Sequence, residues 1–105
     1  MQRQYRQGDV FIIQTDMIPA QAEKQNEKSR IVLEHGEVTG HAHAINDTKE
    51  ADLYLQNARK FLEVCMSASV SHEEHKTIVL PKGNYEVRRQ CTWSALEAMA
   101  RLVAD

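Results

Sequence analysis

Short apolar segments separated by turn-forming residues constrain the fold of this chain more than any other feature. Such segments occur at 10–15 (VFIIQT), 30–35 (RIVLEH), 38–45 (VTGHAHAI), 52–56 (DLYLQ), 60–66 (KFLEVCM), 77–80 (TIVL) and 84–90 (NYEVRRQ). Apolar runs of strand length, bounded by Gly, Pro, Asn and Asp, are typical of sequential antiparallel strands. We therefore predict a mainly β fold, a small antiparallel barrel or rolled sheet of six to seven strands. A closed barrel is attractive because closure removes exposed sheet edges.

Three segments break this pattern. Residues 16–29 are polar and carry no apolar stripe, which predicts a long loop or a short helix. Pro81-Lys82-Gly83 has the composition of a tight turn between two strands. Residues 93–103 place apolar side chains at helical spacing, and Thr92 or Ser94 can cap them, so they predict one C-terminal helix. The 105 residues contain no linker, and residues 1–105 are expected to form a single β-rich domain.

Composition narrows the classes of partner. The formal net charge is -2 and aromatic residues make up 6%, which disfavours a nucleic-acid partner. No apolar run reaches the length of a membrane span, and the polar first residues do not resemble a signal peptide. Cys65 and Cys91 are isolated thiols with no disulfide framework. These features predict a soluble, cytoplasmic protein without a membrane partner.

A domain of this size buries a limited core, so association between subunits is a natural source of further stability. We expect a homodimer. The candidate surfaces are the strand at 10–13, if it lies at a sheet edge, and the apolar stripe of the C-terminal helix, formed by Trp93, Leu96, Met99 and Val103.

The histidines are the residues with catalytic or metal-binding potential that cluster most tightly in the sequence. Four of the five histidines occur in two doublets, His41-Ala42-His43 and His72-Glu73-Glu74-His75. On a strand, His41 and His43 project from the same face, and the small residues beside them leave the other face free to be covered. If the second doublet forms a turn, both of its rings face one way. If it is extended, His72 and Glu74 share a side and His75 faces away.

Both doublets are interpreted as one composite site. The predicted contributors are His41, His43, His72 and His75, with Glu74 as a fifth. Nitrogen and oxygen donors without thiolate suit a divalent metal such as Zn, Ni, Fe or Mn, and an open three-ligand set is typical of catalytic sites. His35 is assigned a structural role because it continues the face of the strand at 30–35.

Three functional hypotheses follow from this site. The first is a binding or accessory module for a divalent metal, a small polar ligand or a protein partner. The second is a metal-dependent enzyme acting on a small molecule, with Glu73 or Glu74 as general base, although no catalytic residue is assigned. The third is an interaction protein of a phage or mobile element, in which the histidines form a purely structural hydrogen-bonded network. We favour binding because the only candidate lid is the polar loop at 16–29.

Charged residues outside the doublets have simpler predicted roles. Asp9 is expected to fix the first turn, and Arg88 is expected to face outward with Glu86. Arg89 points inward or lies at the rim, and an inward arginine needs a carboxylate because an unpaired buried charge is costly. Glu73 and Glu74 are candidate partners of Arg89, but an exposed ion pair is the default expectation.

Several blocks resemble a family of small, functionally uncharacterised bacterial and phage proteins. They are Gln7-Gly8-Asp9-Val10, Gly36-Glu37-Val38-Thr39-Gly40-His41-Ala42-His43, His72-Glu73-Glu74-His75 and Leu80-Pro81-Lys82-Gly83-Asn84-Tyr85-Glu86-Val87-Arg88-Arg89-Gln90. The resemblance covers most of the chain outside residues 16–29 and the C-terminal helix, and it implies no activity.

The chain is also loosely similar to cupins, which are small β-barrels that hold a metal with a His-x-His pair. His41-Ala42-His43 and Pro81-Lys82-Gly83 fit the cupin pattern. Glu86 stands where the pattern has a later histidine, and the His72–His75 doublet has no counterpart in it. This similarity implies a cupin-like, metal-binding barrel.

Overall fold

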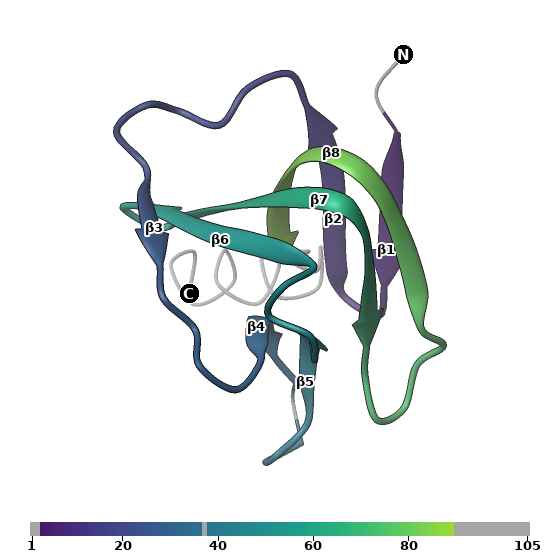
Figure 1. Cartoon of the computed structure of the whole chain (residues 1–105). Helices are drawn as coiled ribbons and strands as arrows, with labels where there is room; N and C mark the ends of the chain where they lie inside the picture. The colour runs from purple at the N-terminus through teal and green to yellow at the C-terminus, as the bar shows by residue number, and fades with distance from the viewer. Residues whose placement is uncertain (1–2, 37, 90–105) are drawn as a thin grey trace, which may run out of the picture.

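A computed structural model describes residues 3–36 and 38–89, which form an all-antiparallel β structure (Figure 1). The strands are β1 (Gln4–Gln7), β2 (Val10–Thr15), β3 (Glu23–Gln25), β4 (Ile31–His35), β5 (Ala42–Ile45), β6 (Ala51–Gln56), β7 (Arg59–Ser71) and β8 (Ile78–Arg89). The prediction of a mainly β, antiparallel fold is confirmed for this part of the chain. The predicted helix at 93–103, and the dimer surface placed on it, lie outside the described residues.

The long strands β7 and β8 organise the sheet. Its main path runs β1-β2-β8-β7-β5-β4, and β6 with β3 branches from β7. The first half of β7 pairs with β6, and its end pairs with β5. Because β7 and β8 bend across the molecule (Figure 1), strands of both branches contribute to one core without closing a ring. The predicted closed barrel is therefore not what the described strands form, since β1 and β4 end the path unpaired with each other.

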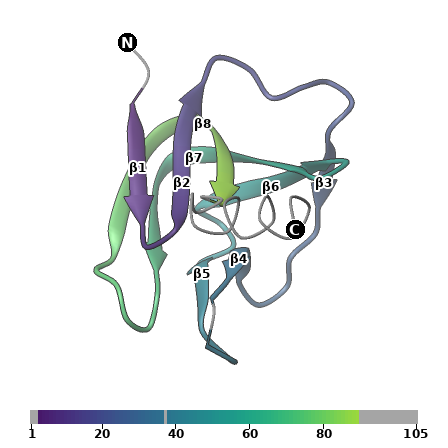
Figure 2. The ribbon, with the colours of Figure 1, turned by 180° about the vertical axis from the view of Figure 1, so that it is seen from behind.

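The apolar strand β2 lies inside the sheet, between β1 and β8, as Figure 2 shows from behind. Val10 and Ile12 are fully buried, whereas Phe11 and Ile13 are half-buried on the other face. The strand is therefore internal to the sheet and not at its edge. Residues 10–13 consequently offer no free edge for dimerisation.

The boundaries of other elements differ from the sequence prediction. The prediction of a turn at Pro81-Lys82-Gly83 is wrong, because β8 continues without interruption through these residues. Pro81 is tolerated there because a β-bulge in β7, between Val64 and Ser67, interrupts the ladder beside it. The polar loop at 16–29 contains β3, which pairs with β6 through its backbone and needs no apolar side chains.

The core combines side chains from most of the strands. The buried cluster includes Ile12, Leu33, Leu62, Leu80 and Tyr85. Tyr85 is fully buried and its hydroxyl donates a hydrogen bond to the Pro81 carbonyl at 2.6 Å, so its one polar atom is satisfied. Among the described residues there is no helix long and apolar enough to cross a membrane.

Candidate metal centre

Three connections between strands surround one cavity. The β1–β2 turn contributes Gly8 and Asp9, the β4–β5 connection contributes His41, and the β7–β8 connection contributes His72 and His75. The cavity measures about 250 Å³ and is lined by Gly8, Asp9, Gly36, Val38, His41, His43, His72, Glu74 and His75. Residues far apart in the sequence therefore meet here because the antiparallel pairing brings these connections together.

A tight turn positions the first histidine. His41 lies just before β5 and not on a strand, whereas His43 lies within β5. The His41 amide donates to the Val38 carbonyl at 3.0 Å, and the Gly36 amide donates to the His41 carbonyl at 2.8 Å. The assumption that His41 and His43 share one strand is thus wrong, but both side chains line the cavity.

The structure brings all four predicted imidazoles together. The ring of His72 is central, with its centroid 5.7 Å from that of His41, 4.3 Å from His43 and 4.7 Å from His75. The rings of His43 and His75 stack at 6.0 Å. Their role as metal ligands stays a prediction, whereas their proximity is a property of the fold.

Two glycines make room for these rings. A Cβ atom on Gly36 would lie 2.9 Å from His72 Nε2, and one on Gly8 would lie 2.7 Å from His75 Nε2. Contacts this short require movement of the ring or the backbone. Gly8 also has a φ of +59°, which L-residues with side chains rarely adopt. The absence of a side chain at both positions lets the imidazole edges approach the backbone.

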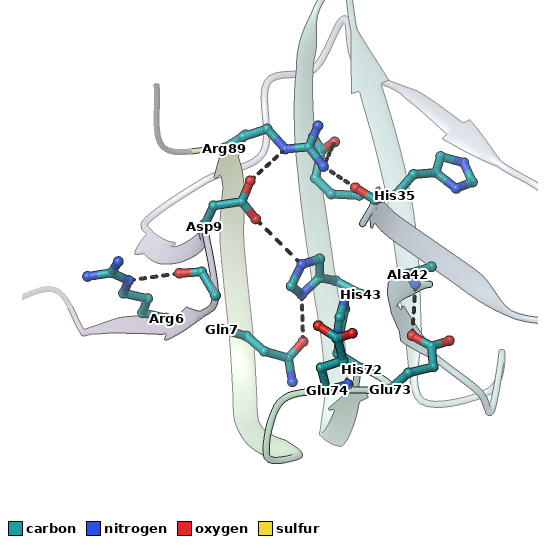
Figure 3. A network of polar contacts seen from close by, with 12 residues as sticks. Arg6, Gln7, Asp9, His35, Ala42, His43, His72, Glu73, Glu74 and Arg89 are labelled. Carbon is teal, nitrogen blue, oxygen red and sulfur yellow. Dashed lines mark hydrogen bonds and ion pairs between the residues drawn. The ribbon is translucent and has the colours of Figure 1, made fainter. Parts of the chain in front are cut away.

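His43 is the buried member of the cluster. The hydrogen bonds of Gln7 show which of its two ring nitrogens carries a proton (Figure 3). The Gln7 Nε2 amide donates to the carbonyls of Val70 and Lys76, both at 2.9 Å. Gln7 Oε1 therefore faces His43 Nδ1, 2.8 Å away, and can only accept. Nδ1 of His43 must carry a proton, so in the neutral ring Nε2 is left with its lone pair.

The surroundings of His43 also favour its neutral form. Burial lowers the pKa of His43 below its usual value, and the neighbouring His72 lowers it further, whereas Asp9 acts in the opposite direction. Nε2 of His43 lies 3.7 Å from Asp9 Oδ1. A neutral imidazole with a free Nε2 is the form that binds a metal.

Arg89 closes the network behind Asp9 (Figure 3). Its Nε lies 3.3 Å from Asp9 Oδ2, its guanidinium lies 3.7 Å from Glu34 Oε2, and it donates to the His35 carbonyl. The partners of Arg89 are therefore Asp9 and Glu34 and not the candidates Glu73 and Glu74. Its side chain is 43% exposed, which agrees with the default expectation of an exposed ion pair. Arg88 is exposed and lies 2.9 Å from Glu86, as predicted. Glu86 itself does not face outward, because it is buried at 8% exposure.

The two glutamates of the second doublet have different surroundings. Glu73 accepts a hydrogen bond from the Ala42 amide at 3.0 Å, which lowers the pKa of its carboxyl. Glu74 is 58% exposed, and its amide donates to His72 Nδ1 at 3.0 Å. Its Oε1 lies 3.5 Å from His41 Nδ1, at ion-pair distance but without the geometry of a hydrogen bond. His41 Nδ1 is thus shielded from solvent and makes no hydrogen bond.

One set of donors is compact enough for a metal ion. Within the described residues, His41, His72 and Glu73 form the group whose ligand atoms all lie within 4.8 Å of one another. Tetrahedral ligands at about 2.0–2.1 Å from zinc are about 3.3 Å apart, so the donor atoms need to approach one another by at most about 1.5 Å. The carboxylate of this group is Glu73, whereas the sequence prediction chose Glu74.

Sequence reasoning did not assign Gln7, Asp9 and Arg89 to the site. The signal for Gln7 is its alternation with Tyr5 in β1, because both side chains turn inward while Gln4 and Arg6 are exposed. His35 is exposed, unlike Ile31 and Leu33 in the same strand, and only its carbonyl takes part in the network. Its structural role stays a prediction.

Comparison with known proteins identifies the family alone. No curated protein and no solved structure is significantly similar to this chain. The sequence model described as "Domain of unknown function (DUF8820)" matches residues 6–90, a range that includes every residue of the cavity. The chain therefore belongs to this family of domains of unknown function.

Proposed function

We propose that this protein is a binding module for a divalent transition-metal ion, held in the histidine-lined cavity by His41, His72 and Glu73. The observation that carries the proposal is the state of His41 Nδ1, which is shielded from solvent and unpaired in hydrogen bonding. A buried nitrogen without a partner calls for an ion or a water molecule to satisfy it. Its neighbours in the compact donor group, one imidazole and one carboxylate, are ligands that Zn, Ni, Fe and Mn accept.

The fold positions two of the three ligands, whereas His72 must exchange the Glu74 amide hydrogen bond on Nδ1, or the proton on Nε2, for the metal. The Ala42 amide orients the Glu73 carboxylate and favours its charged form. Gly36 leaves the space in which the His72 ring sits beside His41. Such outer contacts fix ligand orientation, and their loss typically lowers metal affinity by about 10–100-fold. A structural network of histidines alone is the competing explanation, and it predicts no response to metal.

Metal uptake by protein purified without a His-tag tests this proposal. Chelator-treated protein is loaded with Zn²⁺, and both its metal content and its melting temperature are measured. At a free metal concentration of 100 Kd, binding stabilises the fold by about 2.7 kcal/mol. For a domain of this size, that free energy raises the melting temperature by roughly 10 °C.

The matched variants are His41→Ala and His72→Ala, with His35→Ala as the control. His35 is exposed and lies outside the cavity, so its removal should leave Zn²⁺ uptake and the thermal shift unchanged. Either cavity variant should abolish most of the shift. A wild-type protein whose melting temperature ignores both Zn²⁺ and chelator would refute metal binding and leave the structural network.

A further inference from the structure

We propose that the metal ion keeps an open coordination position, and that a small zwitterionic molecule binds there from the cavity. The carboxylate of this molecule coordinates the ion, and its cationic amine lies beside the carboxylate of Glu74. This inference rests on the proposed function, because it names the class of ligand that the same metal site takes. It also assigns Glu74, which does not belong to the compact donor group, as a residue that determines ligand specificity.

The donor group is one ligand short of a closed metal site. Within the described residues, the compact group consists of His41, His72 and Glu73, whereas a structural zinc ion takes four ligands. Sites with three protein ligands take water or substrate at the remaining position. His41 and His72 also line the cavity, so an ion that they hold borders this space. A ligand therefore reaches the remaining position through the cavity.

The cavity has room for more than an ion. Its volume is about 250 Å³, whereas one water molecule occupies about 30 Å³ in the liquid. Part of its wall is formed by Gly8, Gly36 and Val38, which carry no charge. A small organic molecule can therefore lie beside the ion, with its uncharged atoms against this part of the wall.

The charges around the cavity favour a zwitterion. A divalent ion with one carboxylate ligand, Glu73, keeps a positive charge and accepts a further oxygen donor. Glu74 lines the cavity with a carboxylate that is 58% exposed. The other carboxylate of the lining, Asp9, already pairs with Arg89 at 3.3 Å. Glu74 repels a simple anion and the metal repels a simple cation, whereas a zwitterion meets a complementary charge at each end.

The distance between these two charges suits a short molecule. Glu74 Oε1 lies 3.5 Å from Nδ1 of His41, which is one of the proposed metal ligands. A metal about 2.0–2.1 Å from either nitrogen of that ring lies within about 8 Å of the Glu74 carboxylate. A molecule whose carboxylate and ammonium are separated by one or two carbon atoms spans this distance when each group contacts its partner.

The experiment compares two molecules of nearly the same shape. Glycine betaine has a carboxylate and a quaternary ammonium that cannot coordinate a metal, and tert-butylacetate replaces this ammonium with a neutral carbon. Each molecule is titrated into Zn²⁺-loaded protein, and binding is followed by NMR at the amides of Gly8 and Gly36, which line the cavity. Betaine should bind about fivefold more tightly, because an ion pair with an exposed carboxylate contributes up to about 1 kcal/mol.

Matched variants identify the carboxylate that causes this preference. Glu74→Gln should remove the preference for betaine, because the amide keeps the shape of the side chain but not its charge. Glu23→Gln is the control and should keep the preference, because Glu23 is exposed in β3 and does not line the cavity. Chelator-treated protein should bind neither molecule.

The outcomes separate this inference from the proposed function, because Zn²⁺ uptake is measured before either molecule is added. A preference for betaine that is lost in Glu74→Gln and kept in Glu23→Gln supports the inference. Equal affinity for both molecules, or a preference that survives in Glu74→Gln or without the metal, overturns it. Zn²⁺-loaded protein that binds neither molecule overturns the open position while the proposed function stands. No bound Zn²⁺ at all overturns both.

Discussion

Replacing Gln7 with leucine should destabilise the fold through the buried hydrogen bonds of one amide. Gln7 is buried, with 2% of the residue exposed. Its Oε1 accepts a hydrogen bond from His43 Nδ1 at 2.8 Å, and its Nε2 donates to the carbonyls of Val70 and Lys76 at 2.9 Å. Leucine satisfies none of these groups. The Lys76 carbonyl lies in an exposed connection and can turn to water, whereas His43 Nδ1 and the Val70 carbonyl stay buried. Each unsatisfied buried group costs about 1–3 kcal/mol, so the two groups together give about 2–6 kcal/mol.

Urea unfolding followed by far-UV circular dichroism measures this loss. With a slope of about 1–1.5 kcal/mol/M, the midpoint of Gln7→Leu should fall by at least about 1.3 M. Gln4→Leu, an exposed glutamine in the same strand, is the control and should change the unfolding free energy by less than about 0.5 kcal/mol. If Gln7→Leu were as stable as the control, the inferred proton on His43 Nδ1 and the hydrogen bonds that assign it would be wrong.

Two further predictions concern the cavity and the sheet. Gly36→Ala should lower Zn²⁺ affinity by about tenfold, because the added Cβ displaces the His72 ring. Gly40→Ala is the control: its added Cβ meets open space, so it should lower stability without changing Zn²⁺ affinity. Equal Zn²⁺ affinities of the two variants in a binding titration would contradict this prediction. Hydrogen bonds from Arg59, and then from Arg88, lower the pKa of Glu86 below 4.5. The stability that they add is present above pH 4.5 and is lost as pH falls through the lowered pKa. Glu86→Gln should therefore destabilise the protein at pH 7, and acid titration of both proteins should show the difference shrinking below that range; a constant difference would count against the ion pairs.

The alternation of apolar and polar residues predicted most of the strands, because these strands form where alternate side chains are buried in the core. β2 and β6 bury alternate residues against the core, so their sequences carry the signal. β1 and β3 were not predicted, since they pair through backbone groups and most of their side chains are polar. The order of the strands in the sheet could not be predicted from the sequence either, because it depends on which part of β7 pairs with β5 and which part pairs with β6.

The sequence predicted which histidines form the candidate site, but it did not predict which other residues contact them. The histidine doublets indicated which imidazoles belong together, and the structure places all four around one cavity. Their spacing could not distinguish Glu73 from Glu74, because that choice depends on a hydrogen bond from Ala42, which is distant in sequence. Gln7 and Asp9 come from a different hairpin, and their place beside His43 follows only from the pairing of distant strands.

The coordination shell of bound Zn²⁺ tests the central claim most directly. X-ray absorption on protein loaded with one equivalent of Zn²⁺ should show nitrogen and oxygen ligands at about 2.0–2.1 Å, with the outer-shell scattering that imidazole rings produce. The imidazole contribution should fall in His72→Ala and stay unchanged in His35→Ala. A shell of oxygen atoms alone, the same in all three proteins, would contradict the assignment of this histidine-lined cavity as a metal centre.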